Sequence, residues 1–230
     1  MIQESNRVNG CAGWIWVAAS LLLLTAAFSA AGQTGTKKLD DLYLCGQPNS
    51  PVKIEVFSDF QCPVCGLFYT ETIKPLVADY ASSNKVYIVY HDFPLDMHPL
   101  ARRASLFALA ARRLGRGPWL RVADALYREQ AQWSQDGNIE AALARVLDPT
   151  ELVRLKKLAA DPTTEAALRQ EIMLGQSRNI NATPTLFIIT ESGRQQRVNS
   201  GLSYTVLKDF LERTLRRQPQ RSNLHSSLGS

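Results

Sequence analysis

Two cysteines, Cys62 and Cys65, lie three positions apart in the segment SDFQCPVCGLF, residues 58–68. A pair with this spacing can help to hold a metal ion, form a structural disulfide or exchange disulfides with other thiols. In disulfide exchange the attacking species is the thiolate. The surroundings that the sequence predicts for each sulfur therefore decide between these chemistries.

The elements on either side of the pair are a strand and a helix. VKIEVFS, residues 52–58, is apolar and β-branched and predicts a buried central strand. From Cys62 to about Tyr80, apolar residues recur at three- and four-residue spacing, which predicts a helix. Pro75 inside this helix predicts a kink or a restart.

This strand–helix turn gives the two cysteines different expected roles. Cys62 would lie at the helix N-terminus, where unsatisfied backbone N–H groups and the helix dipole stabilise a thiolate. Pro63 suits the first helical position, because a proline there loses no hydrogen bond. Cys65 follows one turn later on the same face and is expected to be more shielded. We therefore expect Cys62 to react first and Cys65 to resolve the exchange, with a structural disulfide as the alternative.

Further strands and helices follow along the chain. They are a strand at 85–91, a helical region at about 98–179, strands at 184–190 and 194–200, and an amphipathic helix at 203–217. The strand–helix–strand order predicts a parallel crossover, and the last two strands predict an antiparallel hairpin covered by a helix. The expected fold is therefore α/β, a thioredoxin-like mixed sheet with helices on both faces and a helical insertion.

Residues 1–31 are expected to be a targeting segment. Residues 14–31 carry no charge and end in Ser29-Ala30-Ala31, small residues of the kind that precede a signal-peptide cleavage site. An uncleaved signal anchor is the alternative, because the apolar run is just long enough to span a bilayer. In both cases the rest of the chain would lie in the periplasm or on the extracytoplasmic face of a bacterial inner membrane, where disulfides persist.

The remainder of the chain divides into three expected parts. They are a polar lead-in at 32–50, a thioredoxin-like domain at 51–216 with the insertion at about 98–179, and a disordered tail at 217–230.

The cysteine count limits the other uses of these thiols. Cys11 would leave with a cleaved signal, so the mature chain would keep Cys45, Cys62 and Cys65. An odd number excludes a complete disulfide framework, and three cysteines exclude a four-cysteine zinc site. Cys45 could be an inert buried thiol, an intermolecular bridge or a third redox partner.

Charge says little about partners. The 230 residues carry a formal charge of +5, and no dense basic run with interleaved aromatic residues indicates nucleic acid. Six arginines cluster on and after the first inserted helix: Arg102, Arg103, Arg112, Arg113, Arg116 and Arg121. They predict a solvated face, with membrane or partner docking as the alternative. We expect a monomer without a cofactor.

Two histidines keep a metal site open as an alternative. His91 ends a predicted strand and His98 opens the helical region. With Cys62 and Cys65 they could form a zinc site, or a copper site of the kind that an envelope metallochaperone uses. Nothing in the sequence fixes either imidazole near Cys62, so we expect no metal.

Three segments in order, FSDFQCPVC, VYHDFPLDMHPLA and TPTLFI, together resemble the DsbA-like branch of the thioredoxin superfamily over about residues 50–216. The resemblance implies that Cys62 is the nucleophile and Cys65 the resolving thiol. It also implies that Thr183–Pro184 is a cis peptide, in a loop that faces the dithiol and binds substrate backbone. From its own stretch alone, Pro184 predicts only a proline at the start of a strand.

The resemblance implies an exported thiol–disulfide oxidoreductase. Its expected role is that of a dithiol oxidase that introduces disulfides into thiol-containing exported proteins through a mixed disulfide at Cys62. A membrane quinone-linked thiol oxidase would reoxidise it. A disulfide reductase or isomerase is the alternative within the same chemistry, because the Pro-Val dipeptide between the cysteines leaves the direction of electron flow open.

One position departs from the family pattern. An acidic residue six positions before the first cysteine commonly helps to move protons beneath the pair, but here that position is Val56 and the nearby acid is Glu55. A shift of one residue places a strand side chain on the opposite face of the sheet. Glu55 is therefore not expected to act in the site.

Overall fold

The computed structural model describes residues 42–199 and 201–217. All described residues belong to one compact unit. The predicted signal segment, Cys11 and the predicted tail beyond Arg217 lie outside the described residues. None of the helices within the described ranges is long and apolar enough to cross a membrane.

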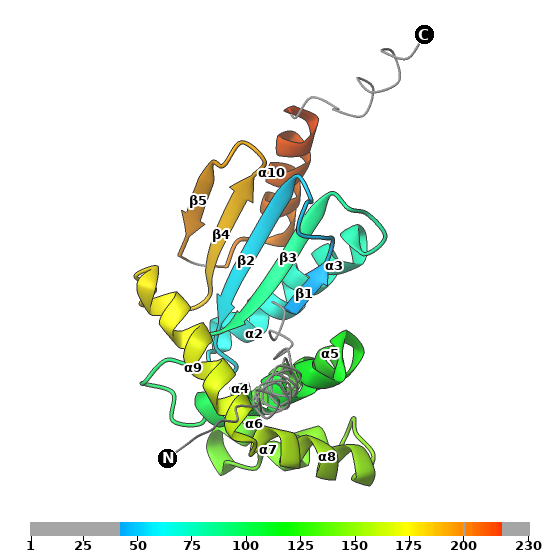
Figure 1. Cartoon of the computed structure of the whole chain (residues 1–230), viewed down its shortest axis with the longest axis vertical. Coiled ribbons are helices and arrows are strands. Elements are labelled where there is room, and N and C mark those ends of the chain that lie inside the picture. Colours follow the sequence, from blue (N-terminus) through cyan, green and yellow to red (C-terminus); the bar gives the residue numbers. More distant parts are fainter. Residues whose placement is uncertain (1–41, 200, 218–230) are drawn as a thin grey trace, which may run out of the picture. The chain divides into compact units, whose positions relative to one another are not determined.

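A mixed five-stranded sheet forms the centre of this unit, in the strand order β1-β3-β2-β4-β5 (Figure 1). The strands are β1 (Leu42–Cys45), β2 (Val52–Ser58), β3 (Val86–Asp92), β4 (Thr185–Thr190) and β5 (Gln195–Val198). β2 pairs with β3 in parallel and with β4 in antiparallel orientation, and β4 and β5 form an antiparallel hairpin. The predicted crossover, the terminal hairpin and the α/β fold class are confirmed.

Helices flank the sheet and form the insertion between β3 and β4 (Figure 1). They are α2 (Pro63–Phe68), the π-helical segment η1 (Tyr69–Ile73), α3 (Lys74–Tyr80), α4 (Ala101–Leu114), α5 (Arg116–Arg128), α6 (Gln130–Asp136), α7 (Ile139–Leu143), α8 (Pro149–Ala159), α9 (Pro162–Ser177) and α10 (Tyr204–Arg217). The helices α4 to α9 make up the predicted insertion. α10 follows the hairpin and contacts α3 and η1.

Turn residues start and end the inserted helices. Asp148 caps α8 by accepting a hydrogen bond from the N–H of Glu151, whose side chain accepts one from the N–H of Asp148. Asp161 caps α9 through the N–H of Thr163. Gly137 ends α6 in the left-handed conformation, with φ 73°.

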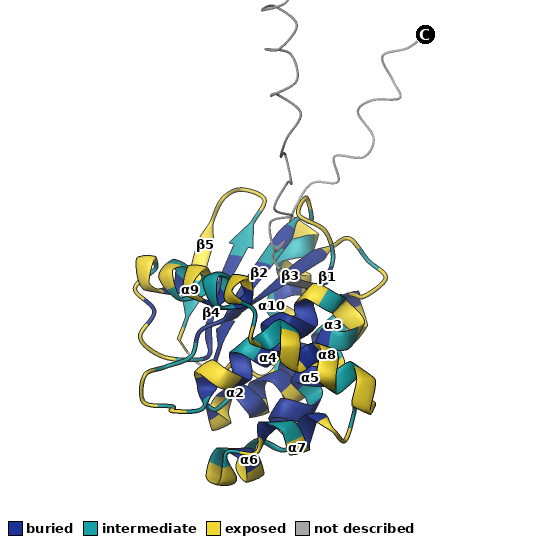
Figure 2. Cartoon of the chain, turned by 60° about the horizontal axis from the view of Figure 1, so that its bottom comes forward, coloured by how far each residue is buried: buried dark blue, intermediate teal, exposed yellow. Residues whose placement is uncertain are grey.

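Alternate residues of β2 face two different parts of the core. Ile54 and Val56 point into the main core, which contains the cysteine pair, whereas Phe57 packs in a smaller cluster with Phe93. Ile172 of α9 packs against that smaller cluster, so helices cover both faces of the sheet. Figure 2 shows the central strands buried, while the helices carry their exposed residues on their outer sides.

The helix after Cys62 is interrupted in front of Pro75, as predicted. In η1 the chain forms a turn of π-helix, and the N–H of Lys74 bonds to the carbonyl of Tyr69, five residues earlier. α3 then begins with Pro75 in its first turn, where the missing N–H of a proline is tolerated.

β1 lies within the expected lead-in of residues 32–50, so the sheet begins before residue 51. It pairs antiparallel with β3 and forms one edge of the sheet. A four-residue strand carries too short a pattern to be recognised in a polar segment. Gly46 follows it with φ +75°, where an added Cβ would lie 2.0 Å from the carbonyl oxygen of Val86.

Candidate active site

The cysteine pair lies at the turn that joins β2 to α2. Cys62 is the N-cap of α2 and Pro63 occupies the first helical position. Cys62 keeps 7% of its surface exposed and Cys65 keeps none. Both are free thiols, so the site is present as its dithiol. The more accessible sulfur is the one that the sequence predicts to react first.

A loop before β4 faces the Cys62 sulfur from a distant part of the chain. In its protonated form the Cys62 thiol donates a hydrogen bond to the backbone carbonyl of Thr183, and the sulfur lies 3.5 Å from that oxygen. The Thr183–Pro184 peptide bond is cis, as the resemblance implies, and β4 begins directly after it. The structure thus brings together all four residues that the sequence predicts for the site: Cys62, Cys65, Thr183 and Pro184.

Hydrogen-bond donors around Cys62 favour its thiolate. The Cys65 thiol and the backbone N–H groups of Cys65 and Val64 lower the pKa of Cys62 to about 5, although burial opposes them. The sequence indicated the backbone groups but missed the largest contribution, which comes from the neighbouring thiol. Burial raises the pKa of Cys65 well above its ordinary value, and the charge on Cys62 raises it further. Near neutral pH the pair therefore holds one proton, on Cys65.

We expect the reduced protein to keep a thiolate at Cys62 in mildly acidic solution. The rate at which iodoacetamide alkylates Cys62 should titrate with a midpoint near pH 5, far below the value of about 8.5 for a free thiol. The lowered pKa also stabilises the folded dithiol form. This stabilisation is complete above the pKa of the unfolded thiol and is lost as the pH falls through the folded value. A midpoint in the range of free thiols would contradict the arrangement.

Contacts with the insertion hold the backbone of the cysteine turn. Gln130, the first residue of α6, donates hydrogen bonds to the carbonyl oxygens of Phe60 at 2.6 Å and Cys62 at 3.0 Å. The side chain of Gln61 accepts one from the N–H of Leu100 at 2.7 Å. Sequence reasoning missed both glutamines, because local patterns do not place α6 or the segment before α4 against the cysteine turn.

Asp59 stabilises the cysteine turn with its buried carboxylate. Its fully buried carboxylate accepts hydrogen bonds from the N–H groups of Gln61 at 2.7 Å and Leu95 at 2.9 Å, and it contacts Nδ1 of His98 at 2.7 Å. The N–H of Asp59 donates to the Cys65 sulfur at 3.5 Å. Asp59 therefore positions the turn with its carboxylate and contacts the resolving sulfur with its backbone.

Three hydroxyl groups lie on the buried side of Cys65. The Ser58 hydroxyl lowers the pKa of the Cys65 thiol against the effect of burial, and it lies 3.0 Å from the Tyr127 hydroxyl. The Tyr127 hydroxyl hydrogen-bonds in turn to that of Tyr90. Sequence reasoning missed all three. Ser58 had a signal, since it follows Val56 on the same face of β2.

Glu55 points away from the cysteine pair, as its position in the strand predicts. Its carboxylate pairs with Lys53 at 2.7 Å and with Arg178. These cations lower the pKa of Glu55 against the effect of its burial. Val56 occupies the main core and is fully buried. The carboxylate of β2 therefore does not reach Cys65.

Sequence comparison places these features in a family. The profile of the family described as Thioredoxin matches residues 38–211. The chain belongs to the thioredoxin family. Among solved structures, DsbA2 of Pseudomonas aeruginosa matches this thioredoxin-family chain with a TM-score of 0.60 and 23% identity, covering 76% of this chain and 95% of that one. Its fold is therefore that of the DsbA-like thiol–disulfide oxidoreductases.

Two curated relatives are similar in sequence to this chain, and the chain covers different shares of their lengths. A protein named Probable disulfide bond formation protein D, from Bacillus anthracis, is 20% identical over 151 residues, which are 62% of this chain and 67% of the relative. A protein named Na(+)/H(+) antiporter NhaA 3, from Salinispora tropica, is 27% identical over 183 residues, which are 79% of this chain. The chain spans only 27% of the length of the second relative.

The two histidines within the described residues, His91 and His98, have partners other than the cysteine pair. The His91 ring stacks on Phe57 with centroids 4.5 Å apart and lies 4.0 Å from Glu171, while His98 contacts Asp59. Within the ranges that the structure describes, no three His, Cys, Asp or Glu side chains are grouped as metal ligands. The geometry there gives the metallochaperone alternative no support.

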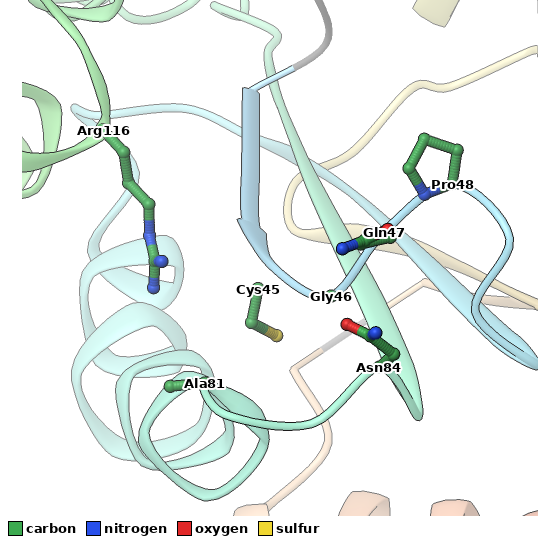
Figure 3. A pocket seen from close by; sticks show the side chains of 7 residues that line it. All are labelled: Cys45, Gly46, Gln47, Pro48, Ala81, Asn84 and Arg116. Carbon is green, nitrogen blue, oxygen red and sulfur yellow. The ribbon is translucent and has the colours of Figure 1, made fainter.

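Cys45 lies at the end of the edge strand β1. It lines a pocket of about 390 Å³ with the turn at 46–48, Ala81, Asn84 and Arg116 (Figure 3). Its thiol donates to the carbonyl of Val86 at 3.6 Å, and burial raises the pKa of Cys45 to about 11. A thiol that stays protonated is a poor nucleophile, which favours an inert Cys45.

Arg112 is an exception in the arginine cluster that the sequence predicts to be solvated. Its guanidinium is buried and contacts Asp92 at 3.2 Å, the carbonyl of Tyr90 at 3.2 Å and the carboxylate of Glu171. Burial, and next the charge of Glu171, raise the pKa of Asp92 well above its ordinary value. The buried cluster of Arg112, Asp92 and Glu171 thus joins β3, α4 and α9. The expectation of a solvated face is wrong for this residue.

Proposed function

We propose that the protein is a dithiol oxidase, which donates the Cys62–Cys65 disulfide to proteins that carry free thiols. The observation that carries this proposal is the difference between the two sulfurs, a stabilised thiolate at Cys62 and a buried neutral thiol at Cys65. Stabilising the thiolate stabilises the dithiol relative to the disulfide. The disulfide thereby becomes a stronger oxidant.

The reaction has two exchange steps. A substrate thiolate attacks the Cys62 sulfur, a substrate–Cys62 disulfide forms, and the electron pair of the broken bond stays on Cys65. A second substrate thiolate then attacks the substrate sulfur and releases Cys62 as a thiolate. Two substrate thiols are oxidised to a disulfide and the pair is reduced. Of the two protons that the substrate loses, one is balanced by protonation of Cys65 and the other goes to solvent.

The surface beside Cys62 suits extended or unfolded protein substrates. Val64 and Leu67 of α2 expose 52% and 61% of their surface, and apolar side chains of an unfolded chain could cover them. The backbone at Thr183–Pro184 faces Cys62 and would bind the substrate backbone beside the attacked sulfur.

The proposed location and partners rest on the sequence and on its resemblance to the DsbA-like branch. The expected targeting segment at 1–31 would export the protein to the periplasm or to the extracytoplasmic face of an inner membrane. Its substrates would be thiol-containing exported proteins. A membrane quinone-linked thiol oxidase would restore the disulfide by accepting two electrons from the Cys62–Cys65 dithiol. The name of the Bacillus anthracis relative agrees with disulfide formation.

The redox potential tests the direction of electron flow. The purified protein is equilibrated in glutathione buffers and the oxidised fraction is measured after acid quenching and thiol labelling. We expect a potential close to the value of about −120 mV that is typical of a strong disulfide donor. A potential near about −270 mV, the range of thioredoxin, would overturn the oxidase proposal in favour of a reductase.

A further inference from the structure

The first exchange step creates an electrostatic problem at Cys65, given the oxidase reaction proposed above. When a thiol attacks Cys62, Cys65 leaves as a thiolate at a position with no exposed surface. An unpaired charge in such a place is costly unless hydrogen-bond donors surround it. The strand position from which a carboxylate could act holds Val56, and Glu55 is paired on the other face.

We propose that a chain of three hydroxyl groups, Tyr90–Tyr127–Ser58, donates a hydrogen bond to the Cys65 sulfur and stabilises it as the leaving thiolate. In this role Ser58 donates directly to the reacting sulfur and is a catalytic residue. Tyr127 and Tyr90 act through Ser58 and are positioning residues. The N–H of Asp59, at 3.5 Å, supplies a second donor to the same sulfur.

The hydrogen bonds among the three hydroxyl groups leave one hydroxyl proton free to be donated to the Cys65 sulfur. Two bonds join the three hydroxyls, Tyr90 to Tyr127 and Tyr127 to Ser58 at 3.0 Å, and they use two of the three protons. The third proton is available to the acceptor at the end of the chain. When each hydroxyl donates towards Ser58, the bonds polarise one another in the direction of the developing negative charge.

The elements around the hydroxyls hold them in place. Tyr90 lies on β3 in register with Val56 of β2, two pairs before the Ser58–Asp92 pair at the end of these strands. The Tyr127 ring packs between Phe60 and Tyr69, with centroid distances of 4.8 Å to each. Tyr127 belongs to α5, so the insertion supplies one member of a chain that otherwise comes from the sheet.

Two isosteric variants test the proposal. Ser58→Ala removes the donor to Cys65, and Tyr127→Phe removes the hydroxyl that polarises it while keeping the ring. Tyr69→Phe is the matched control, because its hydroxyl belongs to the same aromatic cluster but donates to Asp124 at 2.8 Å. Each oxidised protein is reduced by a peptide dithiol in a stopped-flow experiment, and each reduced protein is alkylated at Cys62 by iodoacetamide.

We expect Ser58→Ala to slow the reduction of the disulfide about tenfold to a hundredfold, as for loss of a hydrogen bond to a charged group. Tyr127→Phe should slow it by a smaller factor and Tyr69→Phe should leave it unchanged. Alkylation of Cys62 should stay within about twofold of wild type, because this reaction needs no leaving thiolate at Cys65.

The outcomes separate this inference from the proposed function. Wild-type reduction rates in Ser58→Ala and Tyr127→Phe would overturn the inference alone. Equal slowing of reduction and alkylation would overturn it as well, because that result indicates a distorted site rather than a lost donor. If the wild-type disulfide itself does not react with the peptide dithiol, the proposed function fails.

Discussion

Cys62→Ser is expected to reduce the oxidation of an unfolded, reduced substrate protein to its uncatalysed rate. A serine hydroxyl forms no disulfide, and the remaining Cys65 has no exposed surface through which a protein thiol could reach it. The loss should therefore be complete rather than partial. Substrate oxidation is followed by the appearance of its folded activity, with glutathione disulfide as the terminal oxidant.

Cys45→Ala is the matched control for this loss. Cys45 is buried, its thiol donates to Val86, and burial raises its pKa to about 11, so we expect this variant to retain wild-type turnover. Measurable substrate oxidation by Cys62→Ser above the uncatalysed rate would show that another thiol carries the reaction.

Arg112→Met is expected to lower the free energy of unfolding by about 3–5 kcal/mol, since it leaves buried carboxylates without their cation. Asp92 is fully buried, and the Glu171 carboxylate beside it is nearly so. A loss of this size is a large part of the total stability of a domain. Urea unfolding of the full chain, followed by circular dichroism, measures it.

The stability that Arg112→Met loses should depend on pH. Folding raises the pKa of Asp92, so the protonated form is favoured in the folded protein. The free-energy cost of burying ionised Asp92 without its cation is absent below about pH 3.9, the pKa of Asp in the unfolded chain. This cost grows as the pH rises towards the pKa of Asp92 in the folded protein. Arg112→Met should therefore lose more stability at neutral pH than near pH 4.

Arg102→Met is the matched control on the same helix. Arg102 is 47% exposed and pairs with Glu165 on the surface, so its loss should cost about 0–1 kcal/mol. A cost of similar size for the two substitutions would show that the buried cluster contributes no more to stability than a surface pair.

Local sequence patterns predicted the parts of the site that local structure determines. The strand at 52–58, the turn, and Cys62 at the helix N-terminus all follow from hydrophobic spacing and one proline. The cis peptide at Thr183–Pro184 required the family resemblance, because an isolated proline before a strand gives no reason for it.

The residues of the site that the sequence did not predict are placed there by the packing of the insertion. Tyr127 and Gln130 lie 62 or more positions after Cys65 in the chain, and nothing in the spacing of α5 and α6 places them against the cysteine turn. Arg112 was assigned to a solvated face because it belongs to a run of arginines. Its burial follows from the packing of α4 against β3 and α9, which the charge pattern does not report.

Trapping the intermediate tests the central claim most directly. A Cys65→Ser protein, activated at Cys62 as a mixed disulfide with glutathione, is mixed with a substrate peptide that has one thiol, and the product is digested and mapped by mass spectrometry. The mechanism predicts a stable disulfide between the peptide and Cys62, because the resolving thiol is missing. A peptide attached mainly to Cys45, or no attachment at all, would contradict it.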